Sequence, residues 1–117
     1  MGDVDLKNAL LAGDPDKGEE TREVKTHAGV VVVRGLTRLE ALNLNRGRDM
    51  GELDVAEYEQ RMVSIALVSP AMTPAEVARW QEVDRAGGVL GPVTDAITEL
   101  SGLKQGADKS RVSTARE

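Results

Sequence analysis

The 117-residue sequence contains no cysteine and no phenylalanine, and it has one histidine, one tryptophan and one tyrosine. Without cysteine the chain has neither a disulfide framework nor thiolate metal sites. The core must therefore be built from valine, leucine, isoleucine, methionine and alanine, without the large rings that anchor many protein interiors. We expect a single small domain of modest stability, which oligomerisation would help to stabilise.

Long apolar runs are also missing, since no stretch approaches the ~20 residues of a membrane-spanning helix. Residues 1–5 lack the basic and apolar regions of a signal peptide. The net charge is −5; residues 104–117 hold four basic and two acidic side chains, which leaves −7 on residues 1–103. An acidic body is a poor match to a phosphate backbone, so nucleic-acid binding is not expected. Partners that are basic or expose apolar helices are favoured.

The N-terminal segment, residues 1–19, is predicted to be a short helix with a linker. Three leucines recur at helical spacing in residues 3–12. Asp3 or Asp5 is the expected N-cap, and Gly13 is the expected stop. The turn-rich residues that follow separate this helix from the main domain.

Four consecutive valines in Val30–Arg34 give the strongest strand signal in the chain. Residues 20–26 are a weaker strand candidate, and the three residues 27–29, which include a glycine, join the two into a predicted β-hairpin. A lone hairpin is marginal in water, so helices must cover one face. The unbroken valine run predicts that both faces are covered, the second by a partner or by another copy of the chain.

Three helix starts carry capping-box spacing, in which an N-cap residue is followed by a glutamate three positions later. The pairs are Thr37 and Glu40, Asp54 and Glu57, and Thr73 and Glu76. Pro74 falls at the first helical position, where its missing N–H costs nothing.

A fourth helix is predicted from about Gly91 to Gly102, and the polar residues 45–49 are expected to connect two of the helices. Apolar residues recur on each helix at three- to four-residue spacing. The positions are Val55, Tyr58, Met62 and Ile65; Val77, Trp80 and Val83; and Val93, Ile97 and Leu100, with Leu90 and Leu103 in support.

The helix beginning at Asp54 is expected to be central, because Met62–Val68 is apolar nearly all round. The predicted class is α+β, mostly α: a short N-terminal helix, one β-hairpin and about four helices packed as a small bundle. Residues 20–103 form the domain, and residues 104–117, which lack an apolar face, are predicted to be a flexible tail.

No residues combine into a catalytic or metal site. His27 lies at the predicted hairpin turn, where an exposed turn residue is the better interpretation than a catalytic base. Residues 14–19 lack the acid at the fifth position and the closing glutamate of a calcium loop. We therefore expect a binding protein without cofactors, not an enzyme.

A helical DNA-binding regulator is a disfavoured alternative. Residues 72–80 resemble the first helix of a helix-turn-helix, but residues 92–100, which would be the recognition helix, carry two acids and no base. Trp80 fits both a core position and an interface position, with the core slightly favoured.

The order of several segments is typical of one known family. The first segments are a short N-terminal helix, a hairpin ending in Val-Val-Val-Arg-Gly-Leu-Thr (31–37), and a helix with Leu-Glu at 39–40. A helix ending in Ile-Ala-Leu-Val-Ser-Pro (65–70) and a last helix ending in Glu-Leu-Ser-Gly-Leu (99–103) follow. Over roughly residues 20–103 this order resembles the tail assembly chaperones of long-tailed phages. The segment from Ser69 departs from the family, because it lacks the expected Asp-x-x-Gly.

The resemblance implies a chaperone that binds the tape measure protein in the host cytoplasm, keeps it soluble, and recruits tail tube subunits. Such proteins are absent from the mature virion and often have a longer form made by ribosomal frameshifting. We expect a homo-oligomer whose partner-binding residues are Val30, Val32, Arg34, Trp80 and Val83. The main alternative is a small phage structural or adaptor protein, such as a head–tail connector or a tail subunit.

Overall fold

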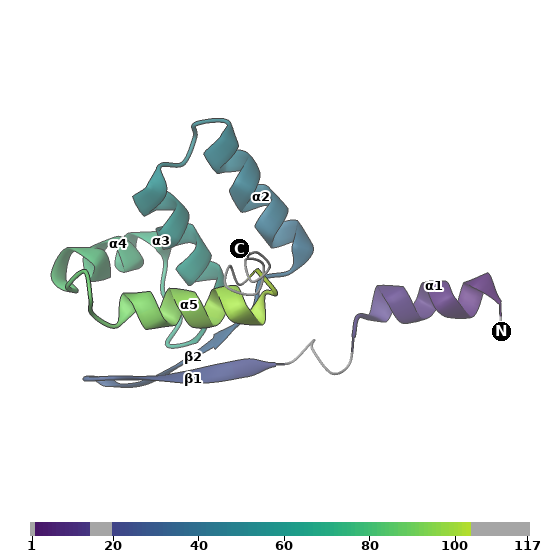
Figure 1. Ribbon diagram of the computed structural model, residues 1–117, viewed down its shortest axis with the longest axis horizontal. Helices are drawn as coiled ribbons and strands as arrows, with labels where there is room; N and C mark the ends of the chain where they lie inside the picture. The colour runs from purple at the N-terminus through teal and green to yellow at the C-terminus, as the bar shows by residue number, and fades with distance from the viewer. Residues whose placement is uncertain (1, 15–19, 104–117) are drawn as a thin grey trace, which may run out of the picture.

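The computed structural model describes residues 2–14 and 20–103 (Figure 1). The elements are α1 (Asp3–Ala12), β1 (Thr21–Thr26), β2 (Gly29–Arg34), α2 (Arg38–Asp49), α3 (Val55–Ala66), β3 (Leu67–Ser69), α4 (Pro74–Val83) and α5 (Leu90–Leu100). The predicted α+β, mostly α class is confirmed. The tail predicted for residues 104–117 lies outside the described residues.

The three strands form one antiparallel sheet in the order β1-β2-β3. The predicted hairpin is confirmed, with Val24 opposite Val31 and Thr26 opposite Gly29. Its turn is one residue shorter than predicted, because Gly29 already belongs to β2. The Thr26 hydroxyl closes the turn, accepting from the Ala28 and Gly29 backbone N–H groups at 3.1 and 3.2 Å.

The third strand corrects the prediction that the helix beginning at Asp54 continues to Val68. The helix α3 ends at Ala66, and Leu67–Ser69 pairs with β2 through an irregular register. Two physical reasons favour this switch. A residue that precedes proline, here Ser69, is disfavoured in the helical region, and Leu67 becomes buried beside Val33 on the sheet.

All three predicted capping boxes are confirmed, and in each of them the N-cap side chain accepts from the glutamate N–H. Pro74 opens α4 at the predicted position. The predicted cap of the first helix is wrong: Gly2 is the N-cap, and both nearby aspartates lie in the first turn. There they still favour the helix, since carboxylates are stabilising near the positive N-terminal end of a helix.

The helix α2 runs through residues 45–49, which corrects the prediction of a connection there. Gly47 explains the difference, because it is buried against Leu53, and a Cβ placed on it would lie 2.8 Å from Leu53 Cδ1. The glycine thus brings the segment after the helix close to its axis. The chain turns only at Gly51, whose φ of +77° suits glycine.

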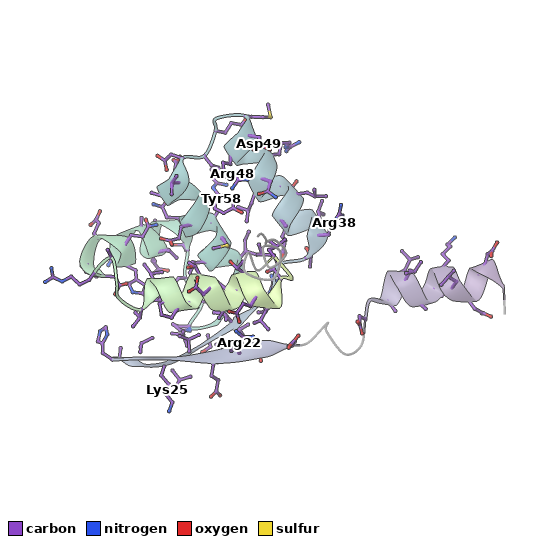
Figure 2. All side chains as sticks on the ribbon, in the orientation of Figure 1. Arg22, Lys25, Arg38, Arg48, Asp49 and Tyr58 are labelled. Atoms are coloured by element: carbon purple, nitrogen blue, oxygen red, sulfur yellow. The ribbon has the colours of Figure 1, made fainter. Side chains whose placement is uncertain are left out.

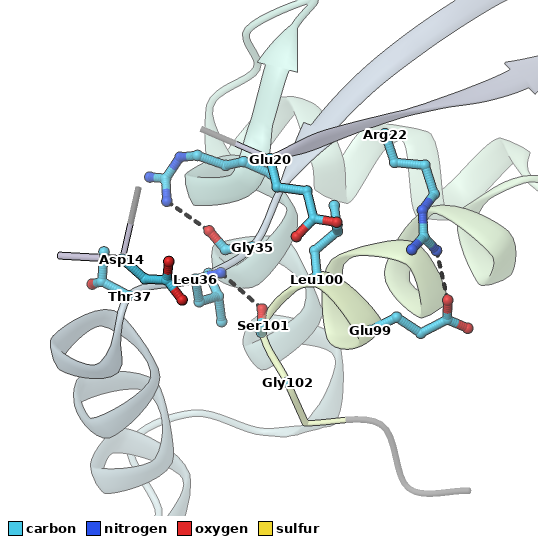
Figure 3. A pocket seen from close by; sticks show the side chains of 11 residues that line it. Asp14, Glu20, Arg22, Gly35, Leu36, Thr37, Glu99, Leu100, Ser101 and Gly102 are labelled. Carbon is cyan, nitrogen blue, oxygen red and sulfur yellow. Dashed lines mark hydrogen bonds and ion pairs between the residues drawn. The ribbon is translucent and has the colours of Figure 1, made fainter. Parts of the chain in front are cut away.

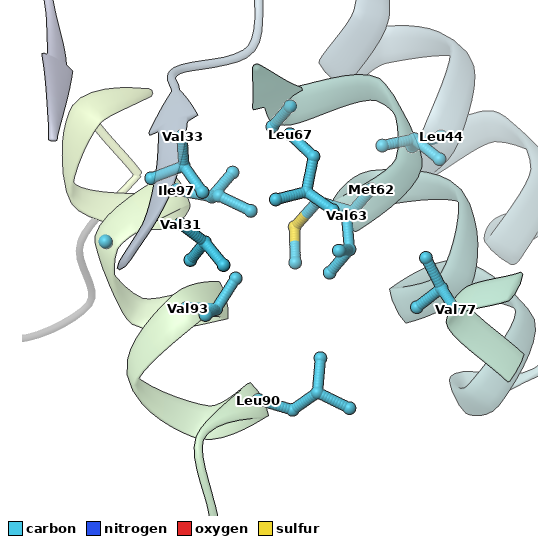
Figure 4. Packing of buried hydrophobic residues seen from close by; sticks show 12 residues of the cluster. Val31, Val33, Leu44, Met62, Val63, Leu67, Val77, Leu90, Val93 and Ile97 are labelled. Carbon is cyan, nitrogen blue, oxygen red and sulfur yellow. The ribbon is translucent and has the colours of Figure 1, made fainter. Parts of the chain in front are cut away.

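Helices α2 to α5 lie on one side of the sheet, and α3 is central, as predicted, because it contacts α2, α4 and α5 (Figure 1). Aliphatic side chains from β2, α3, α4 and α5 meet in one cluster (Figure 4). The fully buried members are Val33, Val63, Ala66, Val77, Val93 and Ile97. Three members of the predicted apolar faces are exposed: Val55 is the first residue of α3, Val83 is the last residue of α4, and Leu103 follows the end of α5.

The junction between β2 and α2 packs tightly against the end of α5. A Cβ on Gly35 would lie 2.6 Å from the backbone carbon and oxygen of Leu100, so only glycine fits this approach. The next residue, Leu36, donates its N–H to the Ser101 hydroxyl at 2.7 Å. The last helix is thereby fixed to the strand-to-helix junction that begins the domain's helical layer.

Candidate interaction surfaces

The outer face of the sheet is the first candidate surface. Val31 and Val33 point into the core, whereas Val30 and Val32 lie on the opposite face. Because the described helices of the body cover one side only, the predicted cover on both faces is not found among residues 2–14 and 20–103 (Figure 1). Val30 is 48% exposed.

Charged side chains of β1 border the two outward valines. Lys25 lies opposite Val30 and Glu23 lies opposite Val32, so partners in the antiparallel register share this face. Figure 2 shows Lys25 on the side of the sheet away from the helices. The outer face therefore presents an apolar strip with one charge of each sign beside it, which suits contact with a partner that is itself amphipathic.

Arg34 lies at the end of β2, and its side chain contacts its own domain. Its two terminal nitrogens donate to both carboxylate oxygens of Glu40 at 3.0 Å, and Nη1 also donates to the Gly35 carbonyl at 2.9 Å. Glu40 in turn accepts from the Thr37 N–H at 2.9 Å as part of the α2 capping box. The predicted partner-binding arginine thus holds the first turn of α2 against the sheet.

This ion pair shifts both ionisation equilibria toward the charged forms. The hydrogen bond from Arg34 is the main cause that lowers the pKa of Glu40, and the capping N–H of Thr37 lowers it further. The same hydrogen bond raises the pKa of Arg34. The two side chains are 36% and 29% exposed, so water screens the pair only partly.

A shallow groove beside α4 is the second candidate surface, and it has a volume of about 540 Å³. It is lined by Pro70, Ala71, Met72, Glu76, Arg79, Trp80 and Val83. Trp80 is half-buried and packs against the core cluster, so it is at once a core residue and part of the groove wall. Val83 is 79% exposed. The structure thus brings together two of the five predicted contact residues.

The segment after β3 links the two surfaces. Ser69 pairs with Val32 on the sheet, and the next two residues, Pro70 and Ala71, line the groove. Val68, which the sequence assigned to a helix, is about half exposed in this strand. Its strand conformation was missed because a short apolar run is ambiguous between helix and strand.

A pocket of about 510 Å³ lies where β1, the β2–α2 junction and the end of α5 meet (Figure 3). Both arginines at its rim are paired within the domain, Arg34 with Glu40 and Arg22 with Glu99, the latter at 2.6 Å. The rest of the lining includes the Gly35–Thr37 junction and Asp14. The Arg22–Glu99 pair joins β1 to α5, which are distant in sequence, and the Arg34–Glu40 pair joins β2 to the next helix, so these charges have a structural role at the pocket.

Within the part of the chain that the structure describes, no three histidine or acidic side chains are grouped closely enough to hold a metal ion. In the same residues, no helix has the length and apolar character needed to cross a bilayer. The outer sheet face and the α4 groove are the two surfaces that hold predicted contact residues with exposed apolar side chains. Comparisons with protein-family models, with curated proteins and with solved structures found no match to this chain.

Proposed function

We propose that this chain is a non-enzymatic tail assembly chaperone of a long-tailed phage. It binds the tape measure protein in the host cytoplasm, keeps that protein soluble, and helps to recruit tail tube subunits. In this proposal it is absent from the mature virion, and a longer frameshifted form shares its domain. The observation that carries the proposal is that the outer sheet face and the α4 groove both expose apolar side chains and are joined by the segment from Ser69 to Ala71.

The groove has the chemistry of a helix-binding site. Its floor is apolar, with Met72 and Trp80, and its rim carries Glu76 and Arg79. An amphipathic helix binds such a groove by inserting apolar side chains at three- and four-residue spacing. The tape measure protein is a long helical chain in the family that the sequence resembles. Many copies of a small domain along one such chain gain avidity from modest individual contacts.

Co-expression with the tape measure protein of the same genome tests this proposal. We expect Val83→Asp in the groove and Val30→Asp on the sheet each to lower the soluble yield of the tape measure protein severalfold. Both side chains are exposed, so neither substitution removes a core contact. The matched control is Val55→Asp, because Val55 is 84% exposed and lies outside both surfaces. Equal yields with all variants, or a soluble tape measure protein without this chain, would refute the chaperone role.

Mass spectrometry of purified virions separates the proposal from a structural subunit. A chaperone that leaves before the particle matures is missing from the virion, whereas a connector or tail subunit is present at a fixed copy number. Detection of peptides from residues 20–103 at that level would reject the proposal in favour of a structural role.

A further inference from the structure

The helix α1 exposes every one of its large apolar side chains. These are Val4, Leu6, Leu10 and Leu11, which are between 59% and 77% exposed, and the helix has no buried residue. Isolated helices shorter than about 12–15 residues are marginal in water, and α1 has ten residues. A helix of this length and composition therefore needs a surface on which to bury its leucines.

The helix α2 carries an unpartnered apolar stripe on the side opposite the core. Leu39, Leu42 and Met50 are 67%, 51% and 64% exposed. At 100° per residue they lie within one face with Arg38 and Arg46, whereas the buried residues Leu44 and Gly47 face the domain. We call these five residues, Arg38, Leu39, Leu42, Arg46 and Met50, the α2 stripe. Figure 2 shows Arg38 on the outer side of α2.

The two surfaces are complementary in length and in charge. At 1.5 Å per residue the ten residues of α1 are about 15 Å long and residues 38–50 span about 20 Å, so α1 fits along the α2 stripe. The first turn of α1 carries Asp3 and Asp5, and the stripe carries Arg38 and Arg46, with Asp49 at its far end. At 100° per residue Asp3 shares the face of Leu6 and Leu10, so a parallel alignment places Asp3 beside Arg38 and away from Asp49. The leucines of α1 then lie along Leu42 and the apolar stem of Arg46.

We propose that α1 is an exchanged arm that packs in parallel along the α2 stripe of a second copy of this chain. A second copy is favoured over the chain's own stripe by the position of Asp14. Asp14 and Thr37 line the same pocket, so α1 ends beside the beginning of its own α2 (Figure 3). Folding back there gives an antiparallel alignment, with Asp3 beside Asp49. In a two-fold dimer each copy supplies one arm and one stripe.

Sedimentation of the full chain over about 1 to 100 μM tests the exchange. The arm variant carries Leu6→Glu with Leu10→Glu, and the stripe variant carries Leu39→Glu with Leu42→Glu. We expect each to raise the dissociation constant of the dimer on the order of 100-fold, because two leucines lose their apolar contacts. The matched control Val55→Glu adds a charge at an equally exposed valine and should leave the constant unchanged.

Mixing the variants gives the decisive result. The arm variant keeps an intact stripe and the stripe variant keeps an intact arm, so a 1:1 mixture restores one contact and forms a heterodimer. Circular dichroism checks the fold of each variant. Titrating the labelled arm variant with wild type also measures heterodimer formation, without the stripe variant. The rest of the arm variant should keep its fold, because α1 has no buried residue.

The arm exchange requires only this chain, so its failure would leave the chaperone role open. Three results would overturn the exchange. A wild type that stays monomeric throughout the concentration range would show that α1 does not join two copies. Unchanged dimers in both variants would assign self-association to another surface, such as the outer sheet face. If the arm variant stays monomeric both with the stripe variant and with the wild type, each α1 binds its own chain.

Discussion

Arg34 illustrates, at the scale of single residues, how a charge at the end of an apolar strand is used inside the domain. Its guanidinium spans from the last residue of β2 to Glu40 in the first turn of α2. Glu40 also caps that helix through the Thr37 N–H, so one carboxylate serves two contacts. The strand and the helix are thus held at a fixed angle.

The pairing makes stability depend on pH in a defined direction. The pKa of Glu40 is lowered in the folded state from its ordinary value of 4.5. The unfolded chain therefore binds the proton more tightly, and the stabilisation is present above 4.5 and lost as the pH falls through the lower folded value. We expect the urea midpoint of the wild type to fall over this range.

The Glu40→Gln variant should lack the pH dependence of stability that Glu40 contributes. Its free energy of unfolding at neutral pH should be lower than that of the wild type by up to about 1 kcal/mol. The amide oxygen can still accept the Thr37 N–H, so the change isolates the charge. Glu57→Gln, at the equivalent place in the α3 capping box, is the control. Identical pH profiles of wild type and Glu40→Gln would contradict the assignment.

At the scale of secondary-structure elements, α5 begins in an unusual way. Its N-cap is Val89, which has no capping side chain. Asp84, five residues earlier, supplies the acceptors instead: its carboxylate accepts from the Val89 and Leu90 N–H groups at 3.3 and 3.0 Å. A carboxylate at this end also interacts favourably with the helix dipole.

Removing this carboxylate should destabilise the domain. We expect Asp84→Ala to lower the free energy of unfolding by about 1–2 kcal/mol, because two N–H groups lose their acceptor. The Asp84→Asn variant keeps an acceptor oxygen, so its free energy of unfolding should fall by less. Asp95→Ala is the control, since Asp95 is an exposed acid within α5. Equal stabilities of Asp84→Ala and Asp95→Ala would exclude the capping role.

The elements that the sequence predicted well are those with local signals. Capping boxes placed the starts of α2, α3 and α4, and the valine run with the glycine-containing turn before it placed the hairpin. Two features depended on distant contacts. Leu67–Ser69 became a strand only because β2 offered a pairing edge, and Asp84 caps a helix from outside its own segment.

The candidate surfaces were only partly predictable for the same reason. Trp80 and Val83 share a groove because both lie on one helix. The other wall of that groove comes from residues after β3, which helical spacing cannot place. Strand alternation predicts that Val30 and Val32 share one face of the sheet, but which face the helices cover is decided by tertiary packing.

At the scale of the whole molecule, the core is aliphatic. No aromatic side chain is among the buried residues of the described ranges, and Tyr58 and Trp80 pack only at the edge of the cluster. Arg48 lies 5.0 Å from the Tyr58 ring centre, at the contact between α2 and α3 (Figure 2). A small core of this kind supports modest stability, and self-association would add to it.

We expect the dilute protein to unfold at about 45–65 °C, the usual range for mesophile domains. If copies associate, the midpoint should rise with protein concentration, because binding to the folded state stabilises it by mass action. Scanning calorimetry at several protein concentrations measures the midpoint and its dependence on concentration. A midpoint above about 80 °C in dilute solution would contradict the modest stability inferred from the core.

The direct passage from Ser69 at the end of β3 to Pro70 in the groove wall has a mechanical consequence. No linker separates the sheet from this wall of the groove. The groove and the outer sheet face therefore turn together. A long partner that grips both is held at a set pitch, so successive copies along it would repeat with the same orientation.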